Sequence, residues 1–313
     1  LHQQNVLAVD PLRRRPIGLM YQRHHRRTAR PASHARSRSR QRQVPLKQRE
    51  SYWWIEAIQT MGSPPPGVRW VHVGDRGEDF FGVYDEARRW GTDWLIRIAK
   101  DRCVETPTGP DKLFSYARRL RRMAQRHLTV RRQGRGAVEE VALSVAAGRV
   151  TLLPSQYEPG YRGCAPVECW VVRVWEANPP RGCEALEWLL CTSLRCETAE
   201  EALFVAGGYS FRWLIEEFHK CEKTGCQVEM RRLEHVERLE PLIGLLSVLA
   251  VWLLQLKFVA RDEPKRPANT FFDGQMVRIM ARYLRKSPKG LTVGEFWRGI
   301  GRLGGHPGRT RDG

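Results

Sequence analysis

Short apolar segments separated by turn residues recur through the first third of the chain. Apolar and β-branched residues at Asn5–Asp10 and Ile17–Tyr21, divided by Pro11 and Pro16, predict two strands joined by a turn. The pattern that follows predicts, in order, the helix Ser51–Met61, the strand Val68–Val73, the helix Phe80–Trp90 and the strand Trp94–Ala99. Strands that alternate with helices in this way predict an α/β fold.

The texture becomes rich in β-forming residues after the basic segment Arg118–Arg135. Alternating residues predict the strands Val138–Val145, Val150–Leu153 and Glu168–Glu176, with turns at Gly148 and at Pro159-Gly160. A strand at Leu186–Thr192, long helices at Ala199–Lys223 and Val236–Val259, and a basic tail at Gly274–Gly313 follow, the tail first helical and then glycine-rich. We therefore predict four parts: 1–130, a β-rich insertion at 131–182, a return to the first texture at 183–262, and a basic C-terminal region at 263–313.

The longest apolar run, Leu242–Leu254, predicts a buried core helix, because a bilayer span needs about 20 apolar residues. We expect no membrane segment. The sequence carries no secretory signal, and its eight cysteines favour reduced structural thiols over a disulfide scaffold or a zinc site. Three cysteine pairs share one spacing, C-x4-C, which is not that of zinc ribbons: Cys164/Cys169, Cys191/Cys196 and Cys221/Cys226. A cytoplasmic protein is the expectation.

Charge narrows the choice of partner. The formal net charge is +19 and the isoelectric point is about 10.1, which favours polyanions, nucleic acid before anionic membranes. Two segments concentrate the basic residues: Arg23–Arg49, which predicts a polar loop, and Arg118–Arg135, which holds eight arginines and no acid. Arginine bias of the whole proteome is the alternative explanation, and an ordinary solvated loop is the alternative for Arg23–Arg49.

One helical segment gathers polar residues of three chemical kinds. At 100° per residue, Tyr209, Arg212, Glu216 and Lys223 fall within about 60° of one another, while Phe211, Ile215 and Phe218 fall on the opposite, apolar face. On such a platform the carboxylate of Glu216 can bind a metal ion and the two cations can bind phosphate oxygens. A solvated face with ordinary i,i+4 pairs is the alternative.

Asp75 supplies a second candidate carboxylate. It follows an apolar strand of the predicted α/β sheet, at the end where ligand-binding side chains collect. A turn-capping Asp is the alternative for this residue alone. Together, Asp75 and Glu216 are typical of a site for Mg²⁺, which prefers oxygen ligands and in pairs promotes in-line attack on phosphodiesters.

The spacing Tyr209-x2-Arg212-x3-Glu216-x6-Lys223 resembles the Y-R-E-K signature of the DDE transposases of bacterial insertion sequences, in the subgroup of the Tn-five-like enzymes. The similarity extends in order over most of the chain, through VGDRGE (Val73–Glu78), LIRIAK (Leu95–Lys100), GCEALEWLLCT (Gly182–Thr192) and YSFRWLIEEFHKCEKTGCQVEM (Tyr209–Met230). The resemblance implies a ribonuclease-H-like core interrupted by a β-rich insertion. It implies catalytic, metal-binding roles for Asp75 and Glu216 with Mg²⁺ or Mn²⁺, and DNA-binding roles for Tyr209, Arg212 and Lys223.

The chain departs from this family at the first catalytic aspartate, which in the family lies on a strand upstream of the segment that resembles 1–21. Asp10 is the one candidate replacement, and its position beside Pro11 favours a turn residue. We therefore expect a chain truncated at the N-terminus, and the tail Phe296–Gly313 resembles a family C-terminus that stops partway. The resemblance also allows a base-stacking aromatic residue in the β insertion, but core positions are the interpretation for Trp170 and Trp175.

The expected function is that of an insertion-sequence transposase that binds double-stranded DNA, both transposon ends and target, as a homodimer. Its expected reaction is Mg²⁺-dependent DNA end cleavage and strand transfer, for which this chain is catalytically incomplete. A non-enzymatic DNA-binding remnant that acts by mixed assembly, or not at all, is the first alternative. A basic RNA- or ribosome-associated protein is the second, but the sequence shows neither aromatic RNP motifs nor a KH-type GxxG loop.

Overall fold

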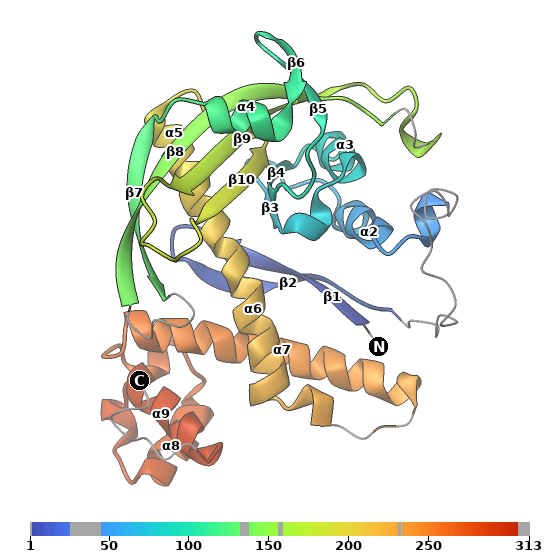
Figure 1. Ribbon diagram of the computed structural model, residues 1–313. Helices are drawn as coiled ribbons and strands as arrows, with labels where there is room; N and C mark the ends of the chain where they lie inside the picture. The colour runs from blue at the N-terminus through green and yellow to red at the C-terminus, as the bar shows by residue number, and fades with distance from the viewer. Residues whose placement is uncertain are drawn as a thin grey trace. The chain divides into compact units, whose positions relative to one another are not determined.

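The computed structural model describes residues 2–25, 45–131, 138–155, 159–230, 233 and 235–305. The chain divides into two compact units, unit 1 (Leu1–Gln4 and His25–Trp213) and unit 2 (Asn5–His24 and Leu214–Gly313). Figure 1 shows the helices and strands of both units. Parts of three predicted segments lie outside the described residues: most of Arg23–Arg49, the last four residues of Arg118–Arg135, and residues 306–313 of the tail.

The centre of unit 1 is a mixed sheet of eight strands among the described residues (Figure 1). Seven of them lie in the order β3 (Val71–Gly74), β4 (Asp93–Arg97), β10 (Glu187–Thr192), β9 (Val167–Glu176), β8 (Val138–Leu152), β5 (Cys103–Thr106) and β6 (Gly109–Lys112). β7 (Ala124–Arg131) pairs with the first half of β8. β3 and β4 are parallel and the other pairs are antiparallel. The strands predicted in the β-rich part thus belong to the same sheet as β3, β4 and β10.

Alternating residues of the central strands build one core on each face of this sheet. Trp94 and Ile96 of β4 belong to one buried cluster, and Leu95 between them belongs to another, as the two-residue period of a strand requires. Helices α2 (Tyr52–Met61), α3 (Phe81–Arg89) and α4 (Leu113–Arg119) contribute to the first cluster, and α5 (Ala199–Gly208) contributes to the second. This layered arrangement confirms the predicted α/β class.

The predicted order strand, strand, helix, strand, helix, strand is confirmed by β1 (His2–Asp10), β2 (Arg15–His25), α2, β3, α3 and β4. The turn predicted at Gly148 is wrong, because β8 runs through this residue without a break. A Cβ on Gly148 would come within 2.6 Å of Tyr116 Oη and Leu120 Cδ2. Glycine at this position therefore allows α4 and its C-terminal turn to pack closely on the strand.

The structure contains elements that the sequence pattern did not predict, and it divides one predicted helix. The hairpin β5–β6, helix α4 and strand β7 lie where the sequence pattern indicated no element. In β7 the arginine-rich composition hides a strand alternation, since Ala124, Leu128 and Val130 pack against the second core cluster. The alternate positions Gln125, His127 and Thr129 are exposed. The single helix predicted at Ala199–Lys223 is four consecutive pieces: α5, the 3₁₀ turn Tyr209–Arg212 (η4), α6 (Trp213–Lys220) and the π-helical turn Cys221–Gly225 (η5).

Unit 2 combines the hairpin of β1 and β2 with helices α7 (Val236–Asp262), α8 (Gly274–Leu284) and α9 (Val293–Leu303). The Gln22 amide donates a hydrogen bond to Ser247 Oγ at 2.7 Å, and the Gln255 amide donates to the Ile17 carbonyl at 2.6 Å, so both fix the hairpin to α7. A separate apolar core joins the C-terminal half of α7 to α8 and α9 through Leu256, Val259, Phe272, Val277, Met280 and Phe296.

Helix α7 is longer than the apolar run from which it was predicted. By length and composition alone, this 27-residue helix could cross a membrane, and half of its most apolar window is buried inside the protein. The prediction that this segment is too short to span a bilayer is therefore wrong, because the helix extends beyond Leu242–Leu254 at both ends. Core helices meet the same two criteria, and Ala250, Leu254 and Leu256 of α7 are fully or almost fully buried.

Asp10 occupies the turn of the β1–β2 hairpin. Its Oδ1 accepts hydrogen bonds from the backbone nitrogens of Leu12 at 2.9 Å and Arg13 at 3.0 Å. This geometry is typical of an Asp that closes a turn on its own backbone. The prediction that Asp10 is a turn residue is confirmed. Trp170 and Trp175, predicted as core residues, are half-buried, and Trp175 lies against the guanidinium of Arg173, 4.3 Å from the ring centre.

Candidate functional site

The carboxyl ends of β3 and β4 form one edge of the unit 1 sheet. The two strands run parallel, with Gly74 opposite Ile96. Asp75 follows β3 directly, and Arg97 is the last residue of β4. Side chains that bind ligands collect at this end of parallel strands, so the fold places Asp75 and Arg97 as neighbours in such a position.

Asp75 is exposed and begins the 3₁₀ turn Arg76–Glu78 (η2) as its N-cap. Its Oδ1 accepts a hydrogen bond from the backbone nitrogen of Gly77 at 2.7 Å. The turn-capping role considered as an alternative is therefore present. Among the described residues no cation forms an ion pair with this carboxylate within 4 Å, so it remains open to a ligand from solvent.

Tyr209 and Arg212 reach the same edge from the helix layer on the second face. They begin and end η4, which follows α5 directly, and η4 contacts β3. Burial raises the pKa of Tyr209, Arg212 and Arg97 lower it, and the carboxylates of Asp75 and Glu78 raise it further. The phenol is therefore protonated at neutral pH and lies within electrostatic reach of Asp75.

Arg97 is surrounded by like charges. Burial lowers its pKa, and the guanidinium groups of Arg76 and Arg212 lower it further, against the opposite effects of Tyr209 and Asp75. Arg76 and Arg212, from two other segments, therefore lie within electrostatic reach of Arg97 at the carboxyl end of β4. Neither Arg76 nor Arg97 received a role from the sequence, although both lie in the segments VGDRGE and LIRIAK that carry the family resemblance.

Glu78 is a second acid at this edge. Its carboxyl atoms occupy the space above Gly74, where a Cβ would lie only 2.5 to 2.7 Å from them. Burial, together with the charge of Asp75, raises the pKa of Glu78 to about 8. The carboxyl group is therefore largely protonated at neutral pH. Its position three residues after Asp75 in the turn is the sequence signal that could have identified it.

Asp79 fixes the backbone on which this edge is built. It is buried, and its carboxylate accepts hydrogen bonds from Tyr84 Oη at 2.6 Å and from the backbone nitrogens of Ala99 at 2.6 Å and Lys100 at 3.0 Å. Arg102 forms an ion pair with the same carboxylate. Asp79 therefore ties the segment after β4 to the start of α3, and so holds the strand end that carries Arg97.

The other two residues predicted for the site lie in unit 2. Glu216 is exposed in the first turn of α6. Lys223 is exposed in the π-helical turn η5 and forms an ion pair with Glu229 at 3.0 Å. Unit 1 thus brings together Asp75, Tyr209 and Arg212, whereas the approach of Asp75 and Glu216 stays a prediction, because these residues belong to different units.

A metal ion at this edge would need carboxylate oxygens as ligands. Within the part of the chain that the structure describes, no group of three or more His, Cys, Asp or Glu side chains is arranged to hold a metal ion. Mg²⁺ is commonly held by one or two carboxylates together with water and substrate phosphates. The exposed carboxylate of Asp75 fits that requirement, and Mg²⁺ or Mn²⁺ remains the predicted cofactor.

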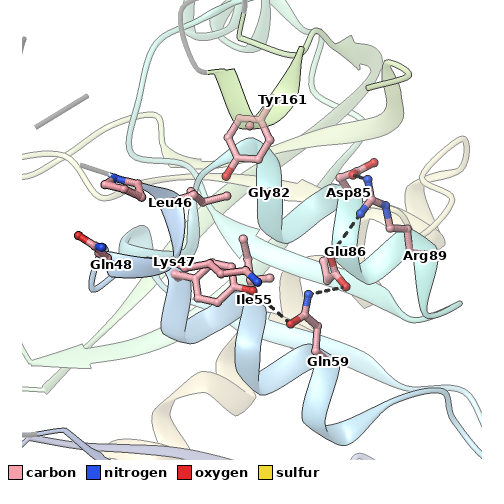
Figure 2. A pocket seen from close by; sticks show the side chains of 13 residues that line it. Leu46, Lys47, Gln48, Ile55, Gln59, Gly82, Asp85, Glu86, Arg89 and Tyr161 are labelled. Atoms are coloured by element: carbon pink, nitrogen blue, oxygen red, sulfur yellow. Dashed lines mark hydrogen bonds and ion pairs between the residues drawn. The ribbon is translucent and has the colours of Figure 1, made fainter. Parts of the chain in front are cut away.

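A pocket of about 490 Å³ lies elsewhere in unit 1, beside α2 and α3 (Figure 2). Its polar side chains pair with one another or with neighbours: Gln59 donates to Glu86 at 3.1 Å, and Arg89 pairs with Asp85 at 2.7 Å. None of the residues predicted for the site lines it. A comparison of the chain with models of known protein families finds no match.

Proposed function

We propose that this chain is a DNA-binding part of a DDE transposase of bacterial insertion sequences, with a ribonuclease-H-like core. The observation that carries the proposal is the convergence of Asp75, Tyr209 and Arg212 at one sheet edge in unit 1. Asp75 is far from Tyr209 and Arg212 in sequence, and the family resemblance assigns all three to one site. The formal charge of +19 supports a polyanionic substrate.

In this proposal Tyr209, Arg212 and Lys223 bind DNA phosphates near the cleaved end. Asp75 and Glu216 hold Mg²⁺ or Mn²⁺, which when bound activates a water or hydroxyl nucleophile and stabilises charge on the phosphate. The neutral phenol of Tyr209 donates a hydrogen bond, while guanidinium groups bind phosphate oxygens in pairs. The protein acts as a homodimer on double-stranded DNA in the bacterial cytoplasm.

Two assigned carboxylates are fewer than the three that the family uses, and Asp10 serves a turn. We therefore expect the chain to bind DNA without cleaving it. Loss of one ligand of a two-metal site removes several kcal/mol of transition-state stabilisation, or about three orders of magnitude in rate. The second candidate is a non-enzymatic DNA-binding remnant that acts by mixed assembly.

Duplex binding measured by fluorescence anisotropy tests the shared part of both proposals. Affinity should fall steeply between about 50 and 200 mM salt, as counterion release requires. Arg212→Ala and Lys223→Ala should each weaken binding, whereas Arg69→Ala, which removes an exposed cation already paired with Asp93 at 2.5 Å, should not. Binding that is absent, or that does not respond to salt, would refute a DNA-binding function.

Nicking of supercoiled plasmid with Mg²⁺ or Mn²⁺ separates the two candidates. No nicking above background is expected from this chain. Nicking that is lost in both Asp75→Asn and Glu216→Gln would show a complete enzyme and reject the incomplete site. Nicking that survives Glu216→Gln would reject the transposase mechanism.

A further inference from the structure

Helix α8 of unit 2 is packed on one side and exposed on the other. Its buried residues belong to the apolar core that α8 shares with α9 and the C-terminal half of α7 (Figure 1). The exposed side carries two rows of side chains, an apolar row (Met276, Ile279 and Tyr283) and an arginine row (Arg278, Arg282 and Arg285). Neighbours within each row are three or four residues apart, so both rows follow the helix axis.

The arginine row has no acidic partner in the part of unit 2 that the structure describes. The acids of the surrounding segment, described from Glu263 to residue 305, are all engaged elsewhere. Glu263 pairs with Arg266 at 3.1 Å, and Glu295 pairs with Lys286. Asp273 is the N-cap of α8 and accepts a hydrogen bond from the backbone nitrogen of the second helical residue at 2.7 Å. The charge of the row is therefore available to a partner from outside.

The last arginine of the row has an unfavourable backbone conformation. Arg285 ends α8 with φ 55° and ψ 45°, in the left-handed region. Helices that end in this conformation usually carry glycine there, because the Cβ of any other residue comes too close to a backbone carbonyl oxygen. An arginine at this position lowers stability, so the fold itself does not explain it. Binding of an anion by its guanidinium does.

The apolar row shows that the partner is more than a simple anion. Ile279 is 63% exposed, which leaves most of its side chain outside the core. A second copy of this chain fits poorly as the partner, because each copy has a formal net charge of +19 and the two repel each other. The face therefore fits a polyanion that also offers apolar surface beside its charges.

Duplex DNA meets both requirements. From Arg278 to Arg285 the helix axis rises by about 10.5 Å, and one strand of a duplex carries a phosphate for every 3.4 Å or so of its axis. The arginine row is therefore long enough to face about three successive phosphates. Proteins that enter the minor groove often combine arginines with side chains such as Met and Ile, which contact the base steps.

We infer that the exposed face of α8 is a second DNA-binding surface of this chain. The arginine row binds backbone phosphates, and the apolar row contacts the groove beside them. The choice of DNA as the polyanion rests on the proposed function. The surface itself shares no residue with the site that contains Tyr209, Arg212 and Lys223, so the two can be tested separately.

Arg285→Gly separates binding from stability. Glycine fits the left-handed backbone without strain, so the melting temperature should stay the same or rise. The same substitution removes one phosphate contact, so duplex affinity should fall, and the slope of log affinity against log salt should decrease by about one. Thermal unfolding and fluorescence anisotropy measure the two effects. A lower melting temperature with unchanged affinity would give Arg285 a structural role and overturn the inference.

The double variant Arg278→Gln with Arg282→Gln tests the rest of the row. It should weaken duplex binding about tenfold or more and decrease the salt slope by about two. The matched control, Arg261→Gln with Arg266→Gln, removes the same charge from two arginines of unit 2 that have carboxylate partners, and it should change binding far less. Equal losses in the two double variants would show that only total charge matters and would overturn the inference.

Ile279→Ala tests the apolar row. It removes no charge, so it should lower duplex affinity at every salt concentration and leave the salt slope unchanged. Because this side chain is mostly exposed, the melting temperature should change little. Affinity equal to that of the wild type would remove the groove contact from the inference.

Three further outcomes separate this surface from the proposed function. If Arg212→Ala weakens duplex binding but the α8 variants match their control, the α8 surface is wrong and the proposed function stands. If the α8 variants weaken binding but Arg212→Ala and Lys223→Ala do not, the surface stands and the proposed site fails. Binding to vesicles of phosphatidylserine and phosphatidylcholine that is lost in the α8 double variant, without duplex binding, would assign the face to a membrane and overturn the inference.

Discussion

Replacing Asp79 by alanine removes the one carboxylate to which the segment beyond β4 and the start of α3 are both attached. The wild-type carboxylate accepts hydrogen bonds from Tyr84 Oη and from the backbone nitrogens of Ala99 and Lys100, and it pairs with Arg102. The Asp79 side chain is 1% exposed and that of Arg102 is 21% exposed. Water therefore has little access to replace the lost acceptor.

The expected destabilisation follows from these contacts. Removal of one partner of a buried ion pair costs about 3 to 5 kcal/mol, because the other charge stays buried and uncompensated. The buried Tyr84 hydroxyl loses its acceptor as well, at a cost of about 1 to 3 kcal/mol. These contributions overlap, since the remaining groups can rearrange, so we expect a total of about 3 to 5 kcal/mol. A loss of this size removes a large part of the stability of a typical domain.

Urea denaturation followed by circular dichroism measures this loss. Glu168→Ala is the control, because Glu168 is an exposed partner of Arg149 and exposed ion pairs contribute at most about 1 kcal/mol. The double variant with Arg102→Met should recover part of the lost stability by removing the uncompensated cation. A loss for Asp79→Ala no greater than that of Glu168→Ala would show that this network does not hold the strand end.

Two other positions give independent checks. Burial lowers the pKa of His72 to about 4, and its Nε2 is buried without a hydrogen-bond partner among the described residues. As the pH falls, the unfolded chain therefore binds a proton at this residue before the folded chain does. The contribution of His72 to stability is full above about pH 6.5 and falls toward pH 4. Urea midpoints between pH 7 and 5 should decline less in His72→Gln than in wild type, and equal slopes would contradict this. A Cβ on Gly82 would lie 2.4 Å from Tyr161 Oη and 2.8 Å from Ile55 Cδ1, so Gly82→Ala should lower the melting temperature. Gly290→Ala, which meets no atom within 4 Å, should not, and matching losses would refute the packing argument.

Local patterns predicted the α/β class because the early strands and helices of this chain have clear hydrophobic periods. The alternation in β7 is equally regular, with Leu128 and Val130 packed against the core, but the arginines on both sides of the strand dominate the composition of the segment. Gly148 was misinterpreted for a different reason. Its small size serves the contact with Tyr116, which is remote in sequence, and no local pattern reveals a remote contact. Strand order across the sheet is a property of the same kind.

The sequence predicts those residues of the candidate site that a local pattern marks. Asp75 ends an apolar strand, and Tyr209 and Arg212 belong to a signature of fixed spacing. Arg97 has no such local sign. Its importance follows from the parallel register of β3 and β4, which places it beside Asp75, and that register is known only from the folded structure. Glu78 likewise acquires its raised pKa from burial over Gly74.

The geometry of Tyr209 and Arg212 differs from the predicted one in a way that aligns their side chains more closely. A continuous α-helix would separate residues i and i+3 by about 60°. The segment Tyr209–Arg212 is a 3₁₀ turn, in which side chains at i and i+3 eclipse one another. Lys223 lies in the π-helical turn η5, so the angle of 100° per residue that was used to place its side chain does not apply there. Tyr209 and Arg212 therefore act with the β3–β4 edge within unit 1, while Glu216 and Lys223 belong to unit 2. In the proposed function each unit therefore supplies one metal-binding carboxylate, Asp75 or Glu216, as well as phosphate-binding groups, so substitutions in either unit should weaken DNA binding.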